Sequence, residues 1–205
     1  MNCLAILGAS GQGKVIADAA EQSGWESIFF FDDAWPERTS NGSWSVIGSS
    51  AELVADLEKF DGVVVGIGDN RIRRLKLQEL GAAGASIVSV IHPSAVVSPC
   101  ARLGLGAVVF ANAVINSEVV IGPGAIINTG AVIEHDCLLG ECVHVSPNAT
   151  LAGGVVLGQL VWVGANACVK QQVSIGDEAV VGMGSVVLRN VIAGQVVAGN
   201  PAKPL

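Results

Sequence analysis

The sequence predicts two domains: an α/β N-terminal Rossmann-like domain over residues 1–90, followed by a left-handed parallel β-helix of hexapeptide repeats over residues 91–205. Two observations carry this prediction. First, an aliphatic residue recurs at every sixth position from Ile91 to Val187. Second, residues 1–90 lack this period, and short apolar runs alternate there with helical patterns. A period of six fits neither the 3.6 residues of an α-helical turn nor the simple alternation of a strand. It is typical of a hexapeptide β-helix, a repeat architecture.

The N-terminal domain is predicted from short apolar runs bounded by Gly, Ser and Asp. Strands are expected over 3–7, 27–31, 62–67 and 86–91. Helices are expected over 14–22, 49–59 and 71–80, with Ser49 as the N-cap of the second. Residues 34–45 are rich in Ser, Asn, Gly and Trp, so we expect a loop there. Alternation of strands and helices indicates a parallel sheet.

In the β-helix, each recurring aliphatic residue is expected to point into the prism. The residue four places later is small or valine, as at Ala95, Ala113 and Ala131, and should fill a corner. Glycine often follows the aliphatic residue, as at Gly104 and Gly122. We expect these glycines to adopt backbone angles that other residues resist.

Composition excludes several classes of function. The chain is 51% hydrophobic but only 4% aromatic, which suits a narrow solenoid interior. A net charge of −7, with no basic cluster for a nucleic-acid backbone, argues against nucleic acid as a partner. We expect no membrane span, because no apolar run reaches about 18 residues. We also expect no signal peptide, because no basic segment precedes the first strand.

The five cysteines indicate the cellular compartment. They are odd in number and scattered, and several occupy repeat positions that favour a small residue. We therefore expect reduced core cysteines in a cytoplasmic protein.

A glycine-rich turn follows the first predicted strand, with the sequence Gly8-Ala-Ser-Gly-Gln-Gly-Lys-Val15. It matches the G-x-x-x-x-G-K of a P-loop, but Val15 stands where Ser or Thr would hold magnesium, which disfavours an NTPase. The glycines would instead let the backbone approach a pyrophosphate at the start of the next helix. Asp32 ends the second strand, where an acidic residue often binds a ribose hydroxyl. The alternative is a purely structural strand-to-helix turn.

The domain has about half the strands of a dinucleotide-binding fold. A single nucleotide therefore fits it better than NAD.

The histidines are His92, His135 and His144. His92 lies at the domain junction, where we expect a structural role. His135 stands between Glu134 and Asp136 at an outward-facing position of its repeat. A neutral imidazole whose tautomer is fixed by a carboxylate is the usual arrangement of a general base. His135 is therefore the predicted base.

Three motifs together resemble bacterial nucleotide-sugar acetyltransferases of the bacillosamine and perosamine type, whose near neighbours include sialic acid O-acetyltransferases. They are G-A-S-G-x-G-K at the start, I-N-T-x-x-V-I-E-H-[DE] in the middle and G-N-P-A-K from Gly199 to Lys203. The resemblance covers nearly the whole chain. It implies a homotrimer, with sites between neighbouring β-helices, that transfers acetyl from acetyl-CoA to a nucleotide-linked amino sugar for surface glycans.

The resemblance also implies roles for individual residues. His135 would accept the amine proton, Asp136 would raise the basicity of His135, and Asn128 would lie beside them. The acetyl-CoA channel would be lined by His144, Gly164, Ala165 and Met183. The nucleotide sugar would be held by Ser10, Gly11, Gln12, Asp32, Asp33 and Gly68. Relatives often carry histidine at position 12, so the identity of the sugar and nucleotide stays open. No metal is expected.

The chemistry fits these roles, because an ammonium cannot attack a thioester and a base must take its proton. Asn128 or backbone N–H groups would stabilise the oxyanion. One alternative is O-acetylation. Another is a zinc enzyme like the hexapeptide carbonic anhydrases, which need three imidazoles. His135 and His144 are half a coil apart, so they should point in different directions. A third alternative, a non-catalytic sugar-nucleotide-binding protein, is disfavoured by the Glu-His-Asp triplet.

Overall fold

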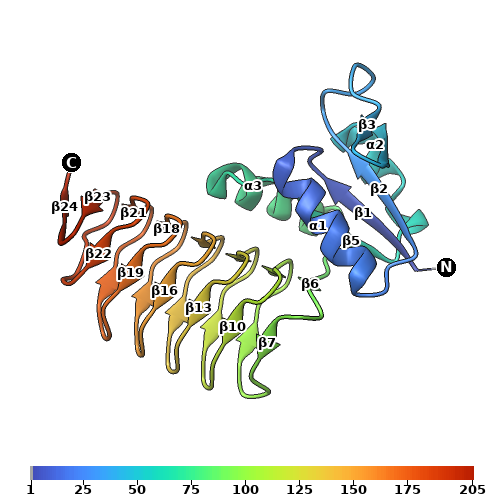
Figure 1. Ribbon diagram of the computed structural model, residues 1–205. Coiled ribbons are helices and arrows are strands. Elements are labelled where there is room, and N and C mark those ends of the chain that lie inside the picture. The colour runs from blue at the N-terminus through green and yellow to red at the C-terminus, as the bar shows by residue number, and fades with distance from the viewer. Residues whose placement is uncertain (1) are drawn as a thin grey trace. The chain divides into compact units, whose positions relative to one another are not determined.

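The computed structural model describes residues 2–205. The chain folds into two compact units, Met1–Pro93 and Ser94–Leu205. Figure 1 shows an α/β arrangement in the first unit and a stack of short-stranded coils in the second. Both predicted architectures are therefore confirmed. Among the described residues, no helix is long and apolar enough to cross a membrane.

The N-terminal unit is built on one mainly parallel sheet. Its strands are β1 (Cys3–Leu7), β2 (Ser27–Phe31), β3 (Ser40–Asn41), β4 (Trp44–Gly48) and β5 (Gly62–Val65). Its helices are α1 (Gly11–Gln22), α2 (Ser50–Ala55), the 3₁₀ turn η1 (Leu57–Lys59) and α3 (Asn70–Ala82). The strand order is β3-β4-β2-β1-β5. The central strand β1 pairs in parallel with both β2 and β5.

Several predicted elements have the expected bounds. Strands β1 and β2 begin and end where the apolar runs do. The N-cap of α2 is Ser49, which forms a capping box with Glu52: the Glu52 N–H donates to Ser49 Oγ, and the Ser49 N–H donates to the Glu52 carboxylate. The helix expected over 49–59 is shorter, because it ends at Ala55 and a 3₁₀ turn follows.

Two expectations for this unit are wrong. The expected loop at 34–45 contains β3 and the start of β4, which form a hairpin. Strand β4 also pairs with β2. The sequence did not predict the hairpin because most residues of 38–45 are polar. The strand expected over 86–91 is reduced to a bridge between Ile87 and Val63, followed by the two-residue β6 (Val90–Ile91). The Val63 N–H donates to the Ser86 carbonyl oxygen, and the Val88 N–H donates to the Val63 carbonyl oxygen; after these two bonds the chain leaves the sheet.

The centre of the sheet is buried on both sides. Leu4, Ala5, Ile6 and Val64 are fully buried. Ile16 is one of the apolar residues of helix α1 that are buried. Continuous apolar strands suit a parallel sheet that is covered by helices. The strand ends, and the loops that follow them, remain available to a ligand.

Three sheets form the faces of the β-helix. The first face consists of β7 (Val96–Val97), β10 (Val114–Ile115), β13 (Val132–Ile133), β16 (Thr150–Leu151), β19 (Cys168–Val169) and β22 (Val186–Val187). The second face consists of β8 (Arg102–Leu103), β11 (Val120–Ile121), β14 (Leu138–Leu139), β17 (Val156–Leu157) and β20 (Ser174–Ile175). The third face includes β9 (Val108–Val109), β12 (Ile126–Ile127), β15 (His144–Val145), β18 (Trp162–Val163), β21 (Val180–Val181) and β23 (Val196–Gly199). The final strand, β24 (Ala202–Pro204), pairs antiparallel with β23.

Each strand pairs in parallel with the strand one coil further along, as Val114 does with Val132. Residues 18 positions apart therefore stack on one another. Two edges of the prism matter below. The turns between the first and second faces form the histidine edge, which includes residues 134–137. The turns between the third and first faces form the asparagine edge, which includes residues 128–131.

The interior of the prism confirms the expected packing. Ile133, Leu151 and Val169 point inward and are almost completely buried. The corner residues Ala131 and Ala149 are fully buried beside them. Burying an aliphatic side chain stabilises a fold by about 1.5–3 kcal/mol, so the stacked aliphatics dominate the stability of this unit.

The expected reason for the glycines is wrong. Gly104, Gly122 and Gly140 do not have positive φ angles. A Cβ on Gly122 would instead lie 2.6 Å from the carbonyl carbon of Gly140 in the next coil. These glycines are thus required by the close approach of adjacent coils. Positive φ occurs three residues after the inward aliphatic residue, as at Asp136 with φ 60°.

The cysteines only partly match expectation. Those in the described residues are free. Cys137 and Cys142 are buried, and burial is the main cause that raises the pKa of the Cys137 thiol. Cys100 and Cys168 are exposed, so they are not core residues. Cys168 is the outward-facing residue of β19, directly before the inward-facing Val169. The six-residue repeat does not require a buried residue at this position.

Candidate active site

His135 and Asp136 form a pair on the histidine edge. His135 Nδ1 lies 2.7 Å from Asp136 Oδ2, and both side chains are more than 60% exposed. A carboxylate can only accept, so Nδ1 must donate its proton and Nε2 is left as the acceptor. The left-handed backbone of Asp136, an angle that Asp tolerates better than most residues, holds the carboxylate beside the ring. The pair therefore presents a basic nitrogen outward.

The next coil places two glycines over this pair. The N–H of Gly154 donates to the backbone oxygen of His135 at 2.9 Å. The imidazole ring of His135 lies against Gly153, and a Cβ at position 153 would collide with the ring. No sequence motif indicated Gly153, although the stacking of residues 18 positions apart was a sufficient signal.

Asn128 and His144 form a second cluster, on the asparagine edge and the third face. The Thr129 N–H donates to Asn128 Oδ1 at 2.8 Å, which leaves Nδ2 to donate to His144 Nε2 at 3.1 Å. The His144 ring stacks on Trp162, with centroids 6.0 Å apart and planes 11° apart. Trp162 Nε1 donates to Ser146 Oγ at 2.8 Å. Trp162 was not expected, although it stands 18 residues after His144.

The other residues expected to bind acetyl-CoA lie on the same edge. Gly164, Ala165 and Met183 are in its turns, and Met183 is 77% exposed. A Cβ on Gly164 would lie 2.7 Å from the backbone nitrogen of Met183, so coil packing explains this glycine. Within one chain, the structure thus groups Asn128 with the expected cofactor residues. It places His135 and Asp136 on a different edge.

In the N-terminal unit, the loops after β1 and β5 face each other. Ser10 Oγ donates to the carbonyl oxygen of Gly66 at 3.5 Å, and Gly68 approaches the first turn of α1 at Gln12. Gly13 packs against the Gly8 carbonyl and the Phe30 ring, so any side chain there would clash. The chain crosses from one side of β1 to the other between β4 and β5. The carboxyl ends of β1 and β5 therefore mark the topological switch point, where α/β sheets bind ligands.

Asp32 holds the glycine-rich turn from the end of β2. Its carboxylate accepts the Ala9 N–H at 2.7 Å and the Ala34 N–H at 3.0 Å. Arg38 lies 3.4 Å from the same carboxylate and donates to the Ala9 carbonyl at 2.8 Å. No sequence motif indicated Arg38, because its contact depends on the path of the chain before β3.

The remaining predicted substrate residues surround this turn. Asp33 accepts the N–H of Ser50 at 2.8 Å, and hydrogen bonds from Ser50 hold the pKa of Asp33 below its ordinary value. Gly11 is exposed, with nothing near the position of a Cβ. Gln12 Nε2 is buried and has no hydrogen-bond partner among the described residues. Ser10, Gly11 and Gln12 therefore lie together at the start of α1.

A protein-held metal ion requires several ligating side chains that converge on one point. Within residues 2–205, no group of three His, Cys, Asp or Glu side chains is arranged to hold an ion. His135 and His144 point from different sides of the prism, as their half-coil separation predicted.

Comparison with known proteins identifies the relatives of both units. Residues 3–80 match the PglD N-terminal domain, and residues 118–153 match the bacterial transferase hexapeptide (six repeats). Over 113 residues the chain is 36% identical to UDP-N-acetylbacillosamine N-acetyltransferase from Bacillus subtilis, covering 53% of this chain and 51% of that protein. The matched segment spans about half the length of this curated relative.

Solved structures match over the whole chain. The acetyltransferase domain of PglB from Neisseria gonorrhoeae FA1090, in complex with acetyl coenzyme A, is 41% identical with a TM-score of 0.95, covering 100% of both chains. PerB from Caulobacter crescentus, in complex with CoA and GDP-perosamine, is 38% identical with a TM-score of 0.94, covering 100% of this chain and 98% of that one. Together with the His135–Asp136 pair, these matches place the chain in the family of bacterial nucleotide-sugar acetyltransferases of the bacillosamine and perosamine type.

Proposed function

We propose that this protein is an acetyl-CoA-dependent N-acetyltransferase that acts on the amino group of a nucleotide-linked amino sugar in surface-glycan synthesis. One observation carries the proposal: His135 presents an accepting Nε2 at an exposed edge, and Asp136 fixes its tautomer from 2.7 Å. The relatives in this family include proteins bound to acetyl coenzyme A and to CoA with GDP-perosamine, which supports the same pair of substrates here.

The proposed reaction uses this pair as a general base. His135 Nε2 accepts a proton from the sugar amine while the amine nitrogen attacks the thioester carbonyl. The Asp136 carboxylate stabilises the imidazolium that forms. The C–N bond forms, the C–S bond breaks, and the proton on His135 passes to the departing thiolate. Asn128 Nδ2 has a second hydrogen besides the one given to His144, and it is suited to the oxyanion.

We further propose a homotrimer, because the two halves of the site lie on different edges of one chain. The first face lies between these edges. Its strands begin with outward-facing residues that carry no charge: Val96, Val114, Val132, Thr150, Cys168 and Val186. If three copies turn this face toward a threefold axis, the histidine edge of each copy meets the asparagine edge of the next. Such an assembly would bring Asn128 and His144 of one copy to His135 of its neighbour.

The proposed nucleotide site is the switch point of the N-terminal unit. Backbone N–H groups at the start of α1 suit a diphosphate, and Asp32 ends β2 where a ribose hydroxyl would bind. The relatives include both a UDP-sugar enzyme and a GDP-sugar complex, so a UDP- or GDP-linked 4-amino sugar is the proposed acceptor. Free cysteines and the use of acetyl-CoA support a cytoplasmic location.

The decisive experiment measures thiol release from acetyl-CoA against UDP-, GDP- and dTDP-linked 4-amino sugars and the matching 4-hydroxy sugars. Turnover of at least one amino sugar, lost in His135→Asn, is the expected result. That variant keeps the approximate shape of the side chain but cannot act as the base. Turnover confined to the hydroxy sugars would make the protein an O-acetyltransferase. Absence of turnover across the panel would overturn the proposal.

A further inference from the structure

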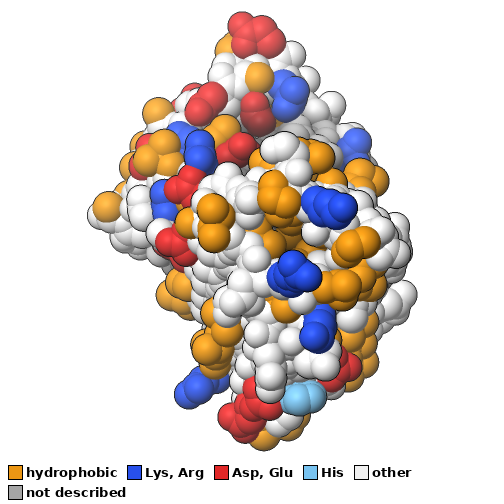
Figure 2. Space-filling model, turned by 90° about the vertical axis from the view of Figure 1, so that its left-hand side faces the viewer, with side chains coloured by type: hydrophobic (Ala, Val, Ile, Leu, Met, Phe, Trp, Pro, Cys, Tyr) orange, Lys and Arg blue, Asp and Glu red, His pale blue; other side chains and the backbone are white. Residues whose placement is uncertain are grey.

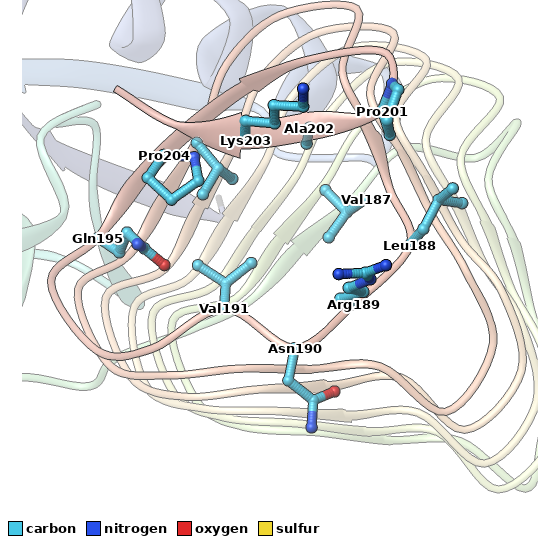
Figure 3. Close-up of a pocket in the computed structure, with 11 residues that line it drawn as sticks. Val187, Leu188, Arg189, Asn190, Val191, Gln195, Pro201, Ala202, Lys203 and Pro204 are labelled. Atoms are coloured by element: carbon cyan, nitrogen blue, oxygen red, sulfur yellow. The ribbon is translucent and has the colours of Figure 1, made fainter.

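Arg73 is the one charged side chain of residues 2–205 that is buried, with 1% of its surface exposed. Every other Lys and Arg is at least partly exposed, and Figure 2 shows basic side chains on the outside of the molecule. Arg189 and Lys203, for example, border a hollow of about 360 Å³ at the C-terminal end of the β-helix (Figure 3). Burying a charge is unfavourable unless the charged group is well hydrogen-bonded. The partners of Arg73 therefore indicate what its burial is for.

The guanidinium of Arg73 binds the loop that joins β5 to α3. Nη1 donates to the carbonyl oxygens of Ile67 and Gly68, both at 3.0 Å, and Nη2 donates to Asn70 Oδ1 at 2.7 Å. Hydrogen bonds from a charged donor are about twice as strong as those between neutral groups. The planar guanidinium also presents its N–H groups in a rigid fork. Arg73 therefore fixes the directions of two successive carbonyl groups of the loop.

The requirements of helix α3 itself do not explain a buried arginine. The buried residues of this helix are Arg73 and Leu80, and Leu80 belongs to the hydrophobic core of the unit. The start of the helix is capped by Asp69, whose carboxylate accepts the Ile72 N–H at 2.9 Å. An apolar side chain at position 73 would pack without the loss of hydration that a buried cation suffers. The contacts of Arg73 thus serve the loop and not the helix.

The loop that Arg73 holds packs on the glycine-rich turn of the proposed nucleotide site. A Cβ on Gly8 would lie 2.7 Å from Ile67 Cγ1, so Ile67 lies directly against that turn. Gly68 lies beside the first turn of α1, where its Cβ would be 4.0 Å from Gln12 Cβ. A shift of the Ile67 or Gly68 backbone would therefore change the space at the start of α1.

Gln12 contributes a hydrogen-bond donor to this space. Its Nε2 is buried and has no hydrogen-bond partner among the described residues. A buried donor without a partner is unfavourable, and such a group in a native structure requires an explanation. An oxygen of a bound ligand would satisfy it. Because Gly68 is a neighbour of Gln12, the position of the loop decides whether that oxygen has room.

We propose that Arg73 is a positioning residue for the nucleotide sugar. By binding the carbonyl oxygens of Ile67 and Gly68, it holds the β5–α3 loop in the arrangement in which Gln12 Nε2 donates to the diphosphate. This inference rests on the proposed function, which places the diphosphate at the start of α1. Arg73 itself does not touch the substrate. Its loss should therefore weaken nucleotide binding and leave CoA binding unchanged, because the proposed CoA residues belong to the β-helix.

The test measures the binding of UDP, GDP, dTDP and CoA, each alone, to Arg73→Lys and Arg73→Met by calorimetry. Lysine keeps the charge but replaces the fork with a single ammonium group. For the nucleotide that the wild type prefers, Arg73→Lys should weaken binding about tenfold and Arg73→Met more, because hydrogen bonds to a charged group are lost. CoA affinity should not change in either variant. Hydrogen exchange at the amides of residues 66–70 should become faster in both.

Two further variants separate positioning from stability. Leu80→Ala is the matched control, because it truncates the other buried side chain of α3. It should lower the stability of the unit through a cavity and leave nucleotide affinity unchanged. Gly68→Ala adds a methyl group beside Gln12, with no neighbour closer than 4.0 Å. It should weaken nucleotide binding at a melting temperature close to that of the wild type.

Wild-type nucleotide affinity in folded Arg73→Lys would overturn the positioning role, even if Arg73→Met failed to fold. An equal loss in Leu80→Ala would also overturn it, because affinity would then follow stability alone. If the nucleotide binds and responds to these variants as expected but the wild type acetylates no amino sugar, the proposed function fails and the role of Arg73 stands. Binding of none of the three nucleotides to the wild type would overturn both.

Discussion

A Cβ on Gly153 would lie 2.6 Å from Cε1 and 2.7 Å from Nε2 of His135. The imidazole therefore occupies the space that any other residue at position 153 would fill. Gly153 stands one coil above His135, so the stacking of coils itself orients the ring. Two contacts then set the direction of Nε2: Asp136 on the Nδ1 side and the bare backbone of Gly153 above the ring.

Gly153→Ala is expected to lower kcat by about a hundredfold, since displacing a catalytic group by about 1 Å costs that much. The φ of Gly153 is not positive, so the backbone accepts alanine and the melting temperature should change little. The Michaelis constants should stay near their wild-type values. Steady-state kinetics and thermal unfolding measure both effects.

Gly154→Ala is the matched control. Gly154 has φ 68°, and a Cβ there would meet only Gln172 Cγ at 3.5 Å. This variant should lose about 1–2 kcal/mol of unfolding free energy, because the backbone is left-handed, while kcat is maintained. If Gly153→Ala keeps full activity, or if both variants lose activity only in proportion to lost stability, Gly153 does not position the base.

Gly140→Ala is expected to destabilise the β-helix without acting on the base. A Cβ on Gly140 would lie 2.6 Å from backbone atoms of Gly158 and Gln159, and backbone cannot move aside as a side chain can. Overpacking of this kind costs about 1–3 kcal/mol. Denaturant unfolding measures the loss. Gly81→Ala, in α3 with nothing within 4 Å of the added methyl group, should be neutral or stabilising. Equal stability of both variants with wild type would contradict the close-packing explanation.

Co-expression of two inactive variants tests the shared site. His135→Ala disables the histidine edge, and Asn128→Ala disables the asparagine edge, where its amide contacts His144. Removal of the base alone should cost at least about a hundredfold in turnover. Mixed trimers would contain interfaces that join an intact histidine edge to an intact asparagine edge, so co-expression should restore part of the activity. The separately purified variants, mixed without exchange of subunits, are the control. Failure of co-expression to restore activity would place the whole site within one copy.

The period of six was sufficient to predict the faces and the interior of the β-helix. It did not assign the glycines correctly, since Gly122 is required by the coil above it and not by its own backbone angles. The contact of His135 with Gly153 was available from the 18-residue stacking. The contacts of Arg38 were not, because they depend on the path of the chain before β3, a strand of two polar residues that carries little signal. Local patterns thus predicted elements well, whereas contacts between turns required the path of the chain.

Asp32→Asn is expected to raise the Michaelis constant for the nucleotide sugar by about 10- to 150-fold and to leave that for acetyl-CoA unchanged. Asp32 accepts the Ala9 N–H at 2.7 Å and faces Arg38, so its charge stabilises the turn that would contact the diphosphate. The loss of a hydrogen bond to a charged group costs about 1.5–3 kcal/mol, which gives this range.

Asp61→Asn is the matched control for this prediction, because Asp61 accepts the Cys3 N–H at the same distance of 2.7 Å, at the opposite end of β1. Both substitutions remove a carboxylate that accepts a backbone N–H beside the central strand. Similar effects on stability are therefore expected, but only Asp32→Asn should change the nucleotide-sugar constant. Steady-state kinetics with each substrate varied in turn separates the two cases. If both variants changed that constant equally, the effect would come from the stability of the sheet, and the nucleotide would have to bind away from the carboxyl end of β2.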